Sequence, residues 1–156
     1  MAEATGTISL TQARAEELEA LLALRIAAMR DSLERLGRFD PERARSRFRD
    51  SFDPAHTRHV VVGNVRVGFL VLKPEDGSLL LDHLYIHPDH QGRGLGSAIL
   101  AIVFAEADAA RLDLRVGALR GSDSNRFYSR HGFTQVGEGD WDIYYARPFV
   151  PSERGA

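Results

Sequence analysis

The segment from Leu79 to Ser97 constrains the fold of this chain more than any other part of its sequence. Its first part, Leu79 to Ile86, is nearly continuous in apolar residues, which predicts a strand buried on both faces in the centre of a sheet. Glycines then alternate with other residues in Gln91 to Ser97, and an apolar helix follows that ends near Arg111. The segment therefore predicts a strand, a glycine-rich loop and a helix in direct succession.

Two helices are expected before this segment. Apolar residues at intervals of three or four predict the first, with Ser9 and Gln12 as a capping box at its start. The second should begin at Asp40-Pro41, where an N-cap residue precedes a proline. The expected elements of this region are a short strand near Thr5 to Ser9, a helix over Leu18 to Leu36, and a second helix that reaches about Phe52.

Further strands and one short helix are expected on either side of the glycine-rich loop. Valines after His59 and the pair Gly63-Asn64 predict a hairpin closed by a two-residue turn. The other expected elements are a turn over Lys73 to Ser78, a strand from Leu112 to Leu119, a helix capped by Gly121-Ser122-Asp123 that ends at His131-Gly132, and an antiparallel pair formed by Phe133 to Val136 and Asp142 to Arg147. This order of elements predicts an α+β fold with a mixed sheet.

Composition and charge restrict the class of protein further. The length of 156 residues suits one domain, and 44% hydrophobic with 27% charged residues is typical of a globular chain. The absence of cysteine excludes disulfides, thiolate metal sites and a cysteine nucleophile. The formal net charge is -2, and no stretch has the length and hydrophobicity of a membrane span or signal peptide. We therefore expect a cytoplasmic protein with no nucleic-acid or membrane partner.

The glycine-rich loop is suited to binding an anion. Backbone N–H groups at a helix start have no partner within the helix, and glycines let a phosphate group approach them. The same glycines could instead form only a tight turn between strand and helix. The loop is not a P-loop, because it lacks Gly-Lys-Ser/Thr, and Gly92, Gly94 and Gly96 do not have the spacing of a dinucleotide-binding loop.

Two separate motifs point to one known family. The first is Gln91-Gly92-Arg93-Gly94-Leu95-Gly96, which fits the pattern Gln/Arg-x-x-Gly-x-Gly/Ala and follows the strand end Leu84-Tyr85-Ile86-His87-Pro88. The second is Ser124 to Phe133, which contains the Asn, Tyr and Gly-Phe of a later helix and turn. Because both motifs and the order of elements agree, the chain resembles the GCN5-related N-acetyltransferase (GNAT) family over Val60 to Arg147.

This resemblance implies a fold, a domain organisation and a ligand. The fold would be a mixed, mostly antiparallel sheet with helices on both faces, in which the third main strand splays from the next. A single N-acetyltransferase domain over residues 1–156 would comprise an N-terminal strand and two helices that frame the acceptor site (1–52), an acetyl-CoA-binding core (59–147) and a tail (148–156). Acetyl-CoA would bind as a cosubstrate where the two strands splay apart, and no metal is expected.

The resemblance also implies which residues bind acetyl-CoA. Its pantetheine arm would lie along the backbone of one strand end like an added strand, and Asn125 would contact the same arm. Its diphosphate would bind backbone N–H groups of the glycine-rich loop, with side-chain contacts from Gln91 and Arg93. The expected cofactor-binding residues are Leu84, Tyr85, Ile86, Gln91, Gly92, Arg93, Gly94, Leu95, Gly96, Ser97 and Asn125.

Catalysis requires a neutral amine and a proton for the departing thiolate. Tyr128 is the expected acid, because a phenol with a pKa of about 10 stays protonated at neutral pH and can donate to a sulfur whose thiol has a pKa of about 8.5. Asp82 is the expected base, since it interrupts an apolar run where burial would raise its pKa. The neighbouring His83, or no base at all, are the alternatives, because the position where some family members place a carboxylate is Leu80 here.

The function implied is transfer of an acetyl group from acetyl-CoA to a primary amine by direct attack on the thioester. A non-catalytic acyl-CoA-binding or sensing module is the alternative, and Tyr128 with Asn125 distinguishes the two. The acceptor would be an amine-bearing small molecule or a peptide, and a homodimer is compatible with this interpretation. The residues expected to frame the acceptor are Met29, Leu33, Phe39, Trp141 and Tyr144.

Overall fold

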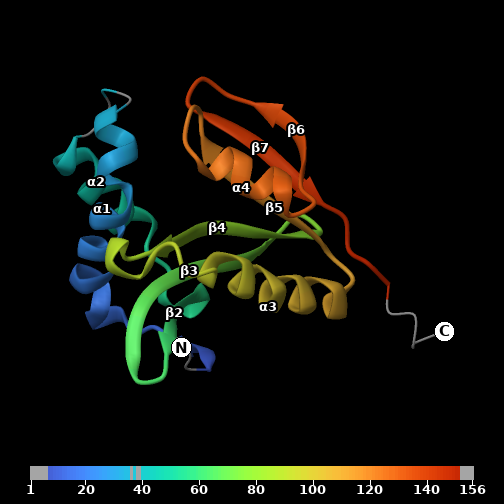
Figure 1. Ribbon diagram of the computed structural model, residues 1–156, viewed down its shortest axis with the longest axis horizontal. Helices are drawn as coiled ribbons and strands as arrows, with labels where there is room; N and C mark the ends of the chain where they lie inside the picture. The colour runs from blue at the N-terminus through green and yellow to red at the C-terminus, as the bar shows by residue number, and fades with distance from the viewer. Residues whose placement is uncertain (1–6, 36, 38–39, 152–156) are drawn as a thin grey trace. The chain divides into compact units, whose positions relative to one another are not determined.

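The chain forms a seven-stranded mixed sheet with the strand order β1-β2-β3-β4-β5-β7-β6 (Figure 1). A computed structural model describes residues 7–35, 37 and 40–151. The elements are β1 (Ile8–Gln12), the 3-10 helix η2 (Ala15–Glu17), α1 (Leu18–Arg35), α2 (Pro41–Ser51), η3 (Pro54–His56), β2 (Thr57–Val62), β3 (Val65–Glu75), β4 (Ser78–Ile86), η4 (Pro88–His90), α3 (Leu95–Ala110), β5 (Asp113–Leu119), α4 (Ser124–Arg130), β6 (Thr134–Glu138) and β7 (Asp142–Arg147).

The expected mixed, mostly antiparallel sheet is confirmed. The pairs β1–β2, β2–β3, β5–β7 and β6–β7 are antiparallel, whereas β4 and β5 are parallel. The parallel ladder joins Ser78–Leu81 to Asp113–Val116, and both strands run on past it, to Ile86 and Leu119. A short ladder between longer strands is the pattern expected of strands that splay apart.

The chain divides into two compact units, and β3 and β4 contribute to both. The first unit is Met1–Val71 with His83–Leu95, and the second is Leu72–Asp82 with Gly96–Ala156. Each unit is described by itself below. The single domain expected from the sequence stays a prediction.

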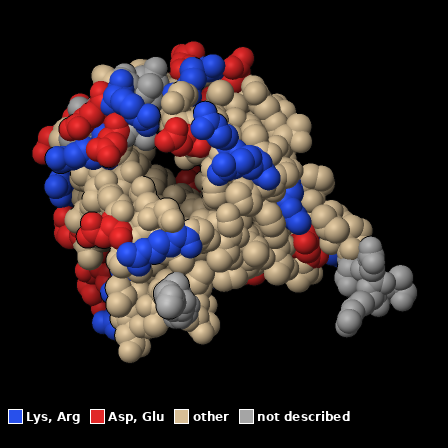
Figure 2. Space-filling model, in the orientation of Figure 1, with Lys and Arg blue, Asp and Glu red and all other residues tan. Residues whose placement is uncertain are grey.

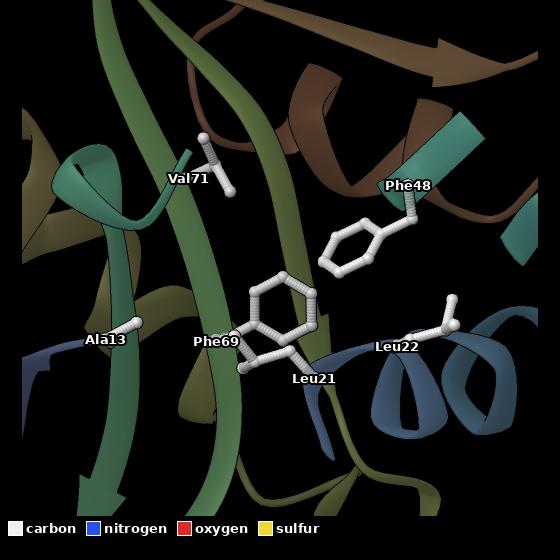
Figure 3. Close-up of a cluster of buried hydrophobic side chains, with 6 residues drawn as sticks. All are labelled: Ala13, Leu21, Leu22, Phe48, Phe69 and Val71. Carbon is white, nitrogen blue, oxygen red and sulfur yellow. The ribbon is translucent and has the colours of Figure 1, made fainter. Parts of the chain in front are cut away.

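The core of the first unit forms where α1 and α2 pack on one face of β3 (Figure 3). The ring of Phe48 from α2 meets Phe69 of β3 edge-on, with the centroids 5.8 Å apart. Phe69 and Val71 lie on one face of the strand because they are two residues apart. The cluster consists of Ala13, Leu21, Leu22, Phe48, Phe69 and Val71. The apolar stripe of the first expected helix therefore packs as predicted.

The start of the first helix differs from the prediction. Ser9 and Gln12 do not form a capping box, because both lie in β1 and pair with β2. The helical segment begins later, where the backbone N–H of Arg14 donates to the Glu17 carboxylate at 2.8 Å. The strand expected near Thr5 to Ser9 begins at Ile8 instead, and the expected residues before Thr7 lie outside the described part of the chain.

The second helix begins as predicted. The Asp40 side chain accepts a hydrogen bond from the backbone N–H of Arg43 at 3.2 Å, and Pro41 occupies the first turn. This is the arrangement that satisfies a free N–H group at a helix start. The helix ends at Ser51, and Phe52 caps it in extended conformation, close to the predicted end.

The prediction that the central strand is buried on both faces is wrong. β4 lies in the middle of the sheet, but of its residues only Ser78 and Leu81 are buried, and Asp82 is exposed. A central position in the sheet therefore does not imply that β4 is buried. The turn before it is also shorter than predicted, because β3 continues through Pro74 and only Asp76-Gly77 turns, both with positive φ.

A partly buried carboxylate, that of Glu17, ties the helical segment to β2 and β3 in the first unit. Glu17 lies 2.9 Å from Nε2 of the buried His59 and 2.7 Å from the guanidinium of Arg66. Hydrogen bonding from His59, with further bonds from the backbone of Arg14 and the Arg66 side chain, lowers the pKa of Glu17 from 4.5 to about 2. The ionised carboxylate is therefore the form that the folded chain favours.

We expect the stabilising effect of Glu17 to be fully present above about pH 4.5 and to be lost as the pH falls toward 2, because its pKa is lower in the folded chain. The free energy of unfolding of the parent protein and of Glu17→Gln, measured with denaturant across this range, checks this. The gap between the two should shrink with falling pH. Glu19→Gln is the control, since the ion pairs of Glu19 with Arg45 and Arg49 are exposed. A gap that does not change with pH would contradict the assignment.

The second unit contains α3, β5, α4 and the antiparallel pair β6–β7. β5 alternates buried and exposed residues, so one of its faces is covered. A partly buried bidentate ion pair joins Arg147 of β7 to Asp108 of α3 at 2.9 and 3.3 Å, and it lowers the pKa of Asp108. The residues that α3 buries are Ile99, Leu100, Val103 and Ala107.

Candidate active site

The end of β4 carries His83 and Tyr85 on the same face of the strand. The Tyr85 hydroxyl lies 3.0 Å from Nδ1 of His83 and accepts a hydrogen bond of 3.3 Å from Nε of Arg25 on α1. The Tyr85 ring packs on Phe69, with the centroids 5.4 Å apart. Because these side chains pack within the first unit, the ligand contacts expected at the end of β4 would be made by backbone groups of the strand.

The neighbouring strand β3 comes very close to this backbone. Gly68 lies opposite it, and a Cβ atom on Gly68 would overlap the carbonyl oxygen of Tyr85. Only glycine therefore allows this approach. The requirement fixes the path of Leu84 to Ile86, the segment that the sequence assigns to the pantetheine arm.

The glycine-rich loop leaves β4 through η4 and enters α3. The Gln91 side chain donates to the carbonyl oxygen of Ile86 at 2.8 Å, which ties the loop to the strand end. Gly92 and Gly94 have φ of +79° and +75°, in the left-handed region that favours glycine. Apart from each glycine and its two chain neighbours, no heavy atom of the described residues lies within 4 Å of a Cβ built on either residue. The loop therefore has bare backbone directly before a helix start, as a phosphate site requires.

The third glycine of the motif, Gly96, is required for helix packing and not for backbone conformation. A Cβ on Gly96 would lie 2.9 Å from the ring of Phe127 on α4, so Gly96 allows close packing of α3 and α4. The Ser97 hydroxyl lies 2.8 Å from Nε2 of His131, whose Nδ1 donates to the carbonyl oxygen of Phe127 at 2.7 Å. The start of α3 is thus fixed to α4 by packing and by a hydrogen-bond chain.

The Asn125 side chain is already engaged within the second unit. Its amide nitrogen donates to the carbonyl oxygens of Leu119 and Ser122 at 2.9 and 3.0 Å, and its oxygen accepts from the Tyr145 hydroxyl at 2.8 Å. These bonds hold the end of β5, the start of α4 and β7 together. The hydroxyl of Ser122 beside it is buried and has no partner among the described residues.

Tyr128 lies on α4 in an aromatic cluster of the second unit. It is 6% exposed, and its ring packs edge-on against Phe133 and near Phe127 and Tyr145. The cluster fixes the ring from several sides, so the direction of the hydroxyl is set by packing. A fixed phenol suits a proton donor, and it suits a purely structural aromatic residue equally well.

Asp82 does not have the environment expected from the sequence. Its side chain is 34% exposed, and its carboxylate lies 3.3 Å from the ammonium of Lys73 on β3. The inference that a buried, unpaired acid must have a special role therefore loses its premise. Lys73 is the only lysine of the chain, but nothing in the sequence indicates which acid it contacts.

The structure thus collects the expected residues into groups within each unit. In the first unit, Gln91 joins the loop to the strand end. In the second, α4 carries Asn125 and Tyr128 and contacts the start of α3. Sequence reasoning did not assign Arg25 to this region. The available signal was that Arg25 is the one charged residue in the apolar stripe of its helix.

The described residues contain neither a candidate membrane span nor a candidate metal site. None of the helices in ranges 7–35 and 40–151 combines the length and hydrophobicity needed to cross a membrane. The same part of the chain has no group of three or more His, Cys, Asp or Glu residues that could hold a metal ion.

Of the residues expected to frame the acceptor, Trp141 and Tyr144 are exposed, and Phe39 lies outside the described residues.

Comparison with known proteins identifies the family. A family model described as an acetyltransferase (GNAT) domain matches residues 55–135, which is more than half of the chain. The chain therefore belongs to the GNAT acetyltransferase family, and the resemblance stated from the sequence is confirmed. The search of curated proteins finds no match.

Solved structures show the same fold. The PaiA N-acetyltransferase from Thermoplasma acidophilum, in complex with coenzyme A, has a TM-score of 0.75 at 16% identity, covering 92% of this chain and 99% of that chain. An acetyltransferase from Thermus thermophilus has a TM-score of 0.70 at 25% identity, with 91% and 97% covered. The ribosomal-protein-S18-alanine N-acetyltransferase from Escherichia coli has a TM-score of 0.68 at 15% identity, with 96% and 99% covered.

Proposed function

We propose that this protein transfers the acetyl group of acetyl-CoA to a primary amine. The observation that carries the proposal is the bare backbone at Gly92 and Gly94, which leads directly into α3 in a chain of the GNAT family. The free N–H groups of the first helical turn are donors for a diphosphate. Gln91 and Arg93 would supply further contacts from the same loop, and Leu95, Gly96 and Ser97 would contribute their backbone N–H groups.

The strand end is the proposed site for the rest of the donor. Backbone groups of Leu84, Tyr85 and Ile86 would hydrogen-bond the pantetheine amides and the thioester carbonyl, as an added strand does at a sheet edge. The sequence assigns Asn125 a contact with the same arm, but its amide is engaged by protein partners, so its proposed role is to hold the end of β5 and the start of α4 together.

The chemical step is a direct displacement. The amine nitrogen attacks the thioester carbonyl carbon, the C–N bond forms, and the C–S bond breaks with its electron pair moving to sulfur. The Tyr128 hydroxyl donates the proton that converts the thiolate to a thiol. A base removes one proton from the attacking nitrogen, and the amide product and free coenzyme A result.

Asp82 is the proposed base, and His83 is the alternative. The exposed carboxylate of Asp82 can take a proton from the amine and pass it to solvent. The alternative role of Asp82 is structural, through its ion pair with Lys73. His83 is hydrogen-bonded to Tyr85 and packs against the ring of Phe48 in the first unit. The two candidates therefore differ in their environments, and mutation can separate them.

We expect Asp82→Asn to lower turnover about a hundredfold or more at neutral pH, and we expect turnover to recover as rising pH supplies neutral amine. The pH profile of kcat with saturating acetyl-CoA measures this. Lys73→Met is the matched variant, because it breaks the same ion pair and keeps the carboxylate. If both variants lose thermal stability and neither changes the shape of the pH profile, Asp82 is structural.

A screen of acyl donors against amine acceptors, followed by the release of free thiol, tests the proposed function. We expect acetyl-CoA to release thiol only when a suitable amine is present, with the acetyl group recovered on nitrogen. Tight binding of acetyl-CoA without thiol release for any amine would favour the alternative, a non-catalytic acyl-CoA-binding or sensing module. Failure to bind coenzyme A would overturn both.

A further inference from the structure

Arg25 has an unusual environment for an arginine of a surface helix. It is half-buried on α1, and its guanidinium lies over the rings of Phe48 and Tyr85, 5.8 Å from each centroid. Its hydrogen-bond acceptors are neutral: the Tyr85 hydroxyl at 3.3 Å and the carbonyl oxygen of Ala44 at 3.4 Å. All of these groups belong to the first unit.

Arg25 has no carboxylate partner among the described residues. The other N–H groups of its guanidinium have no acceptor in that part of the chain. Neighbouring arginines differ, since Arg45 and Arg49 both pair with Glu19. Figure 2 shows basic and acidic side chains beside one another on the face in view.

A half-buried cation without a counter-charge is costly, because it has lost water and gained no anion in return. A guanidinium also has a planar fork of donors that matches a carboxylate in bidentate geometry. The two rings pack near the guanidinium, and its hydrogen bonds to described residues use only part of this fork. The site is therefore prepared for an anionic group of a ligand.

We infer that Arg25 binds a carboxylate of the acceptor, so that the acceptor is an amino acid or a similar molecule that carries both an amine and a carboxylate. The inference rests on the proposed function. Tyr85 connects the carboxylate site at Arg25 with the proposed thioester site. Its side chain is hydrogen-bonded to Arg25, and its backbone is part of the segment proposed for the thioester. An acceptor held at Arg25 by its carboxylate would place its amine toward that segment.

The test compares acceptors that differ only in charge. The common amino acids and their α-carboxamides serve as matched pairs, and kcat/KM is measured for each at saturating acetyl-CoA. We expect at least one acid to exceed its carboxamide by about ten- to a hundredfold, the range for a charge-assisted hydrogen-bonded pair. In parallel, calorimetric titration of the same compounds into the free and coenzyme A-loaded protein measures binding without turnover.

Three variants locate the effect. Arg25→Gln should remove the preference for the acid, whereas Arg25→Lys should keep part of it because the charge remains. Arg45→Gln is the control, since it removes an exposed arginine of the neighbouring helix and should leave the preference unchanged. A structural role of Arg25 would lower stability and reduce activity with acid and carboxamide alike. The comparison of acids with carboxamides uses the parent protein, so it remains valid even if the variants do not fold.

Each outcome decides the inference separately from the proposed function. Equal use or equal binding of acids and carboxamides by the parent protein, or a preference that survives in Arg25→Gln, overturns the carboxylate site and leaves acetyl transfer standing. Binding of coenzyme A with no carboxylate-dependent binding or turnover does the same. If coenzyme A does not bind, the proposed function fails, and the titration of acids and carboxamides into the free protein still decides whether Arg25 binds a carboxylate.

Discussion

Replacing Tyr128 by phenylalanine should lower kcat by about two to four orders of magnitude, the range for loss of a general acid. The substitution removes only the hydroxyl, so the aromatic packing against Phe133 and Tyr145 is kept. We therefore expect the affinity for coenzyme A and the melting temperature to change little. Steady-state kinetics with a working acceptor, together with calorimetric titration of coenzyme A, measures both quantities.

A neighbouring hydroxyl provides the matched comparison for this variant. Tyr145 lies in the same aromatic cluster, and its hydroxyl donates a hydrogen bond to the side-chain oxygen of Asn125. The substitution Tyr145→Phe removes this hydrogen bond. We expect this change to weaken coenzyme A binding more than it lowers kcat, because Asn125 positions the loop between β5 and α4. If Tyr128→Phe keeps turnover near the parental value, Tyr128 is a packing residue, and the thiolate must be protonated by water.

Replacing Gly94 by valine should weaken coenzyme A binding by about a hundredfold or more. The residue has φ of +75°, which a β-branched side chain rarely adopts, so the loop must change its path. The change would remove two or more charge-assisted hydrogen bonds from backbone N–H groups to the diphosphate, each worth about 1.5 to 3 kcal/mol. Calorimetric titration with coenzyme A measures the loss.

The control for Gly94→Val is the same substitution at Gly63. Gly63 also has positive φ, +63°, and open space around a built Cβ, but it lies in the turn between β2 and β3. We expect Gly63→Val to lose stability and to bind coenzyme A like the parent protein. Parental affinity in a folded Gly94→Val protein would show that the loop assignment is wrong.

Local patterns were sufficient to predict most elements of the fold. The cap at Asp40-Pro41 and the two-residue turn at Gly63-Asn64 depend on neighbouring residues alone, and both are found where expected. The capping box at Ser9 and Gln12 failed because pairing with β2 holds those residues in a strand. Pairing partners far along the chain are not visible in a local pattern.

The site shows the same division. The glycine-rich loop could be located from its spacing, because backbone freedom is a property of the glycines themselves. The pairing of Asp82 with Lys73 could not, since it depends on the register of β4 against β3. The contact of Arg25 with Tyr85 could not either, since it depends on how two segments 60 residues apart in sequence pack. Hydrophobicity along the strand suggested a buried Asp82, whereas the structure leaves it exposed beside a cation.

The central claim is that coenzyme A binds with its diphosphate on the loop that precedes α3. Titration of the isotope-labelled protein with coenzyme A, followed by backbone amide NMR, tests it most directly. We expect the largest and saturable shift changes at the amides of Gly92 to Ser97, with further changes at Leu84 to Ile86. Binding that leaves the amides of Gly92 to Ser97 unchanged, or the absence of any saturable change, would contradict the claim.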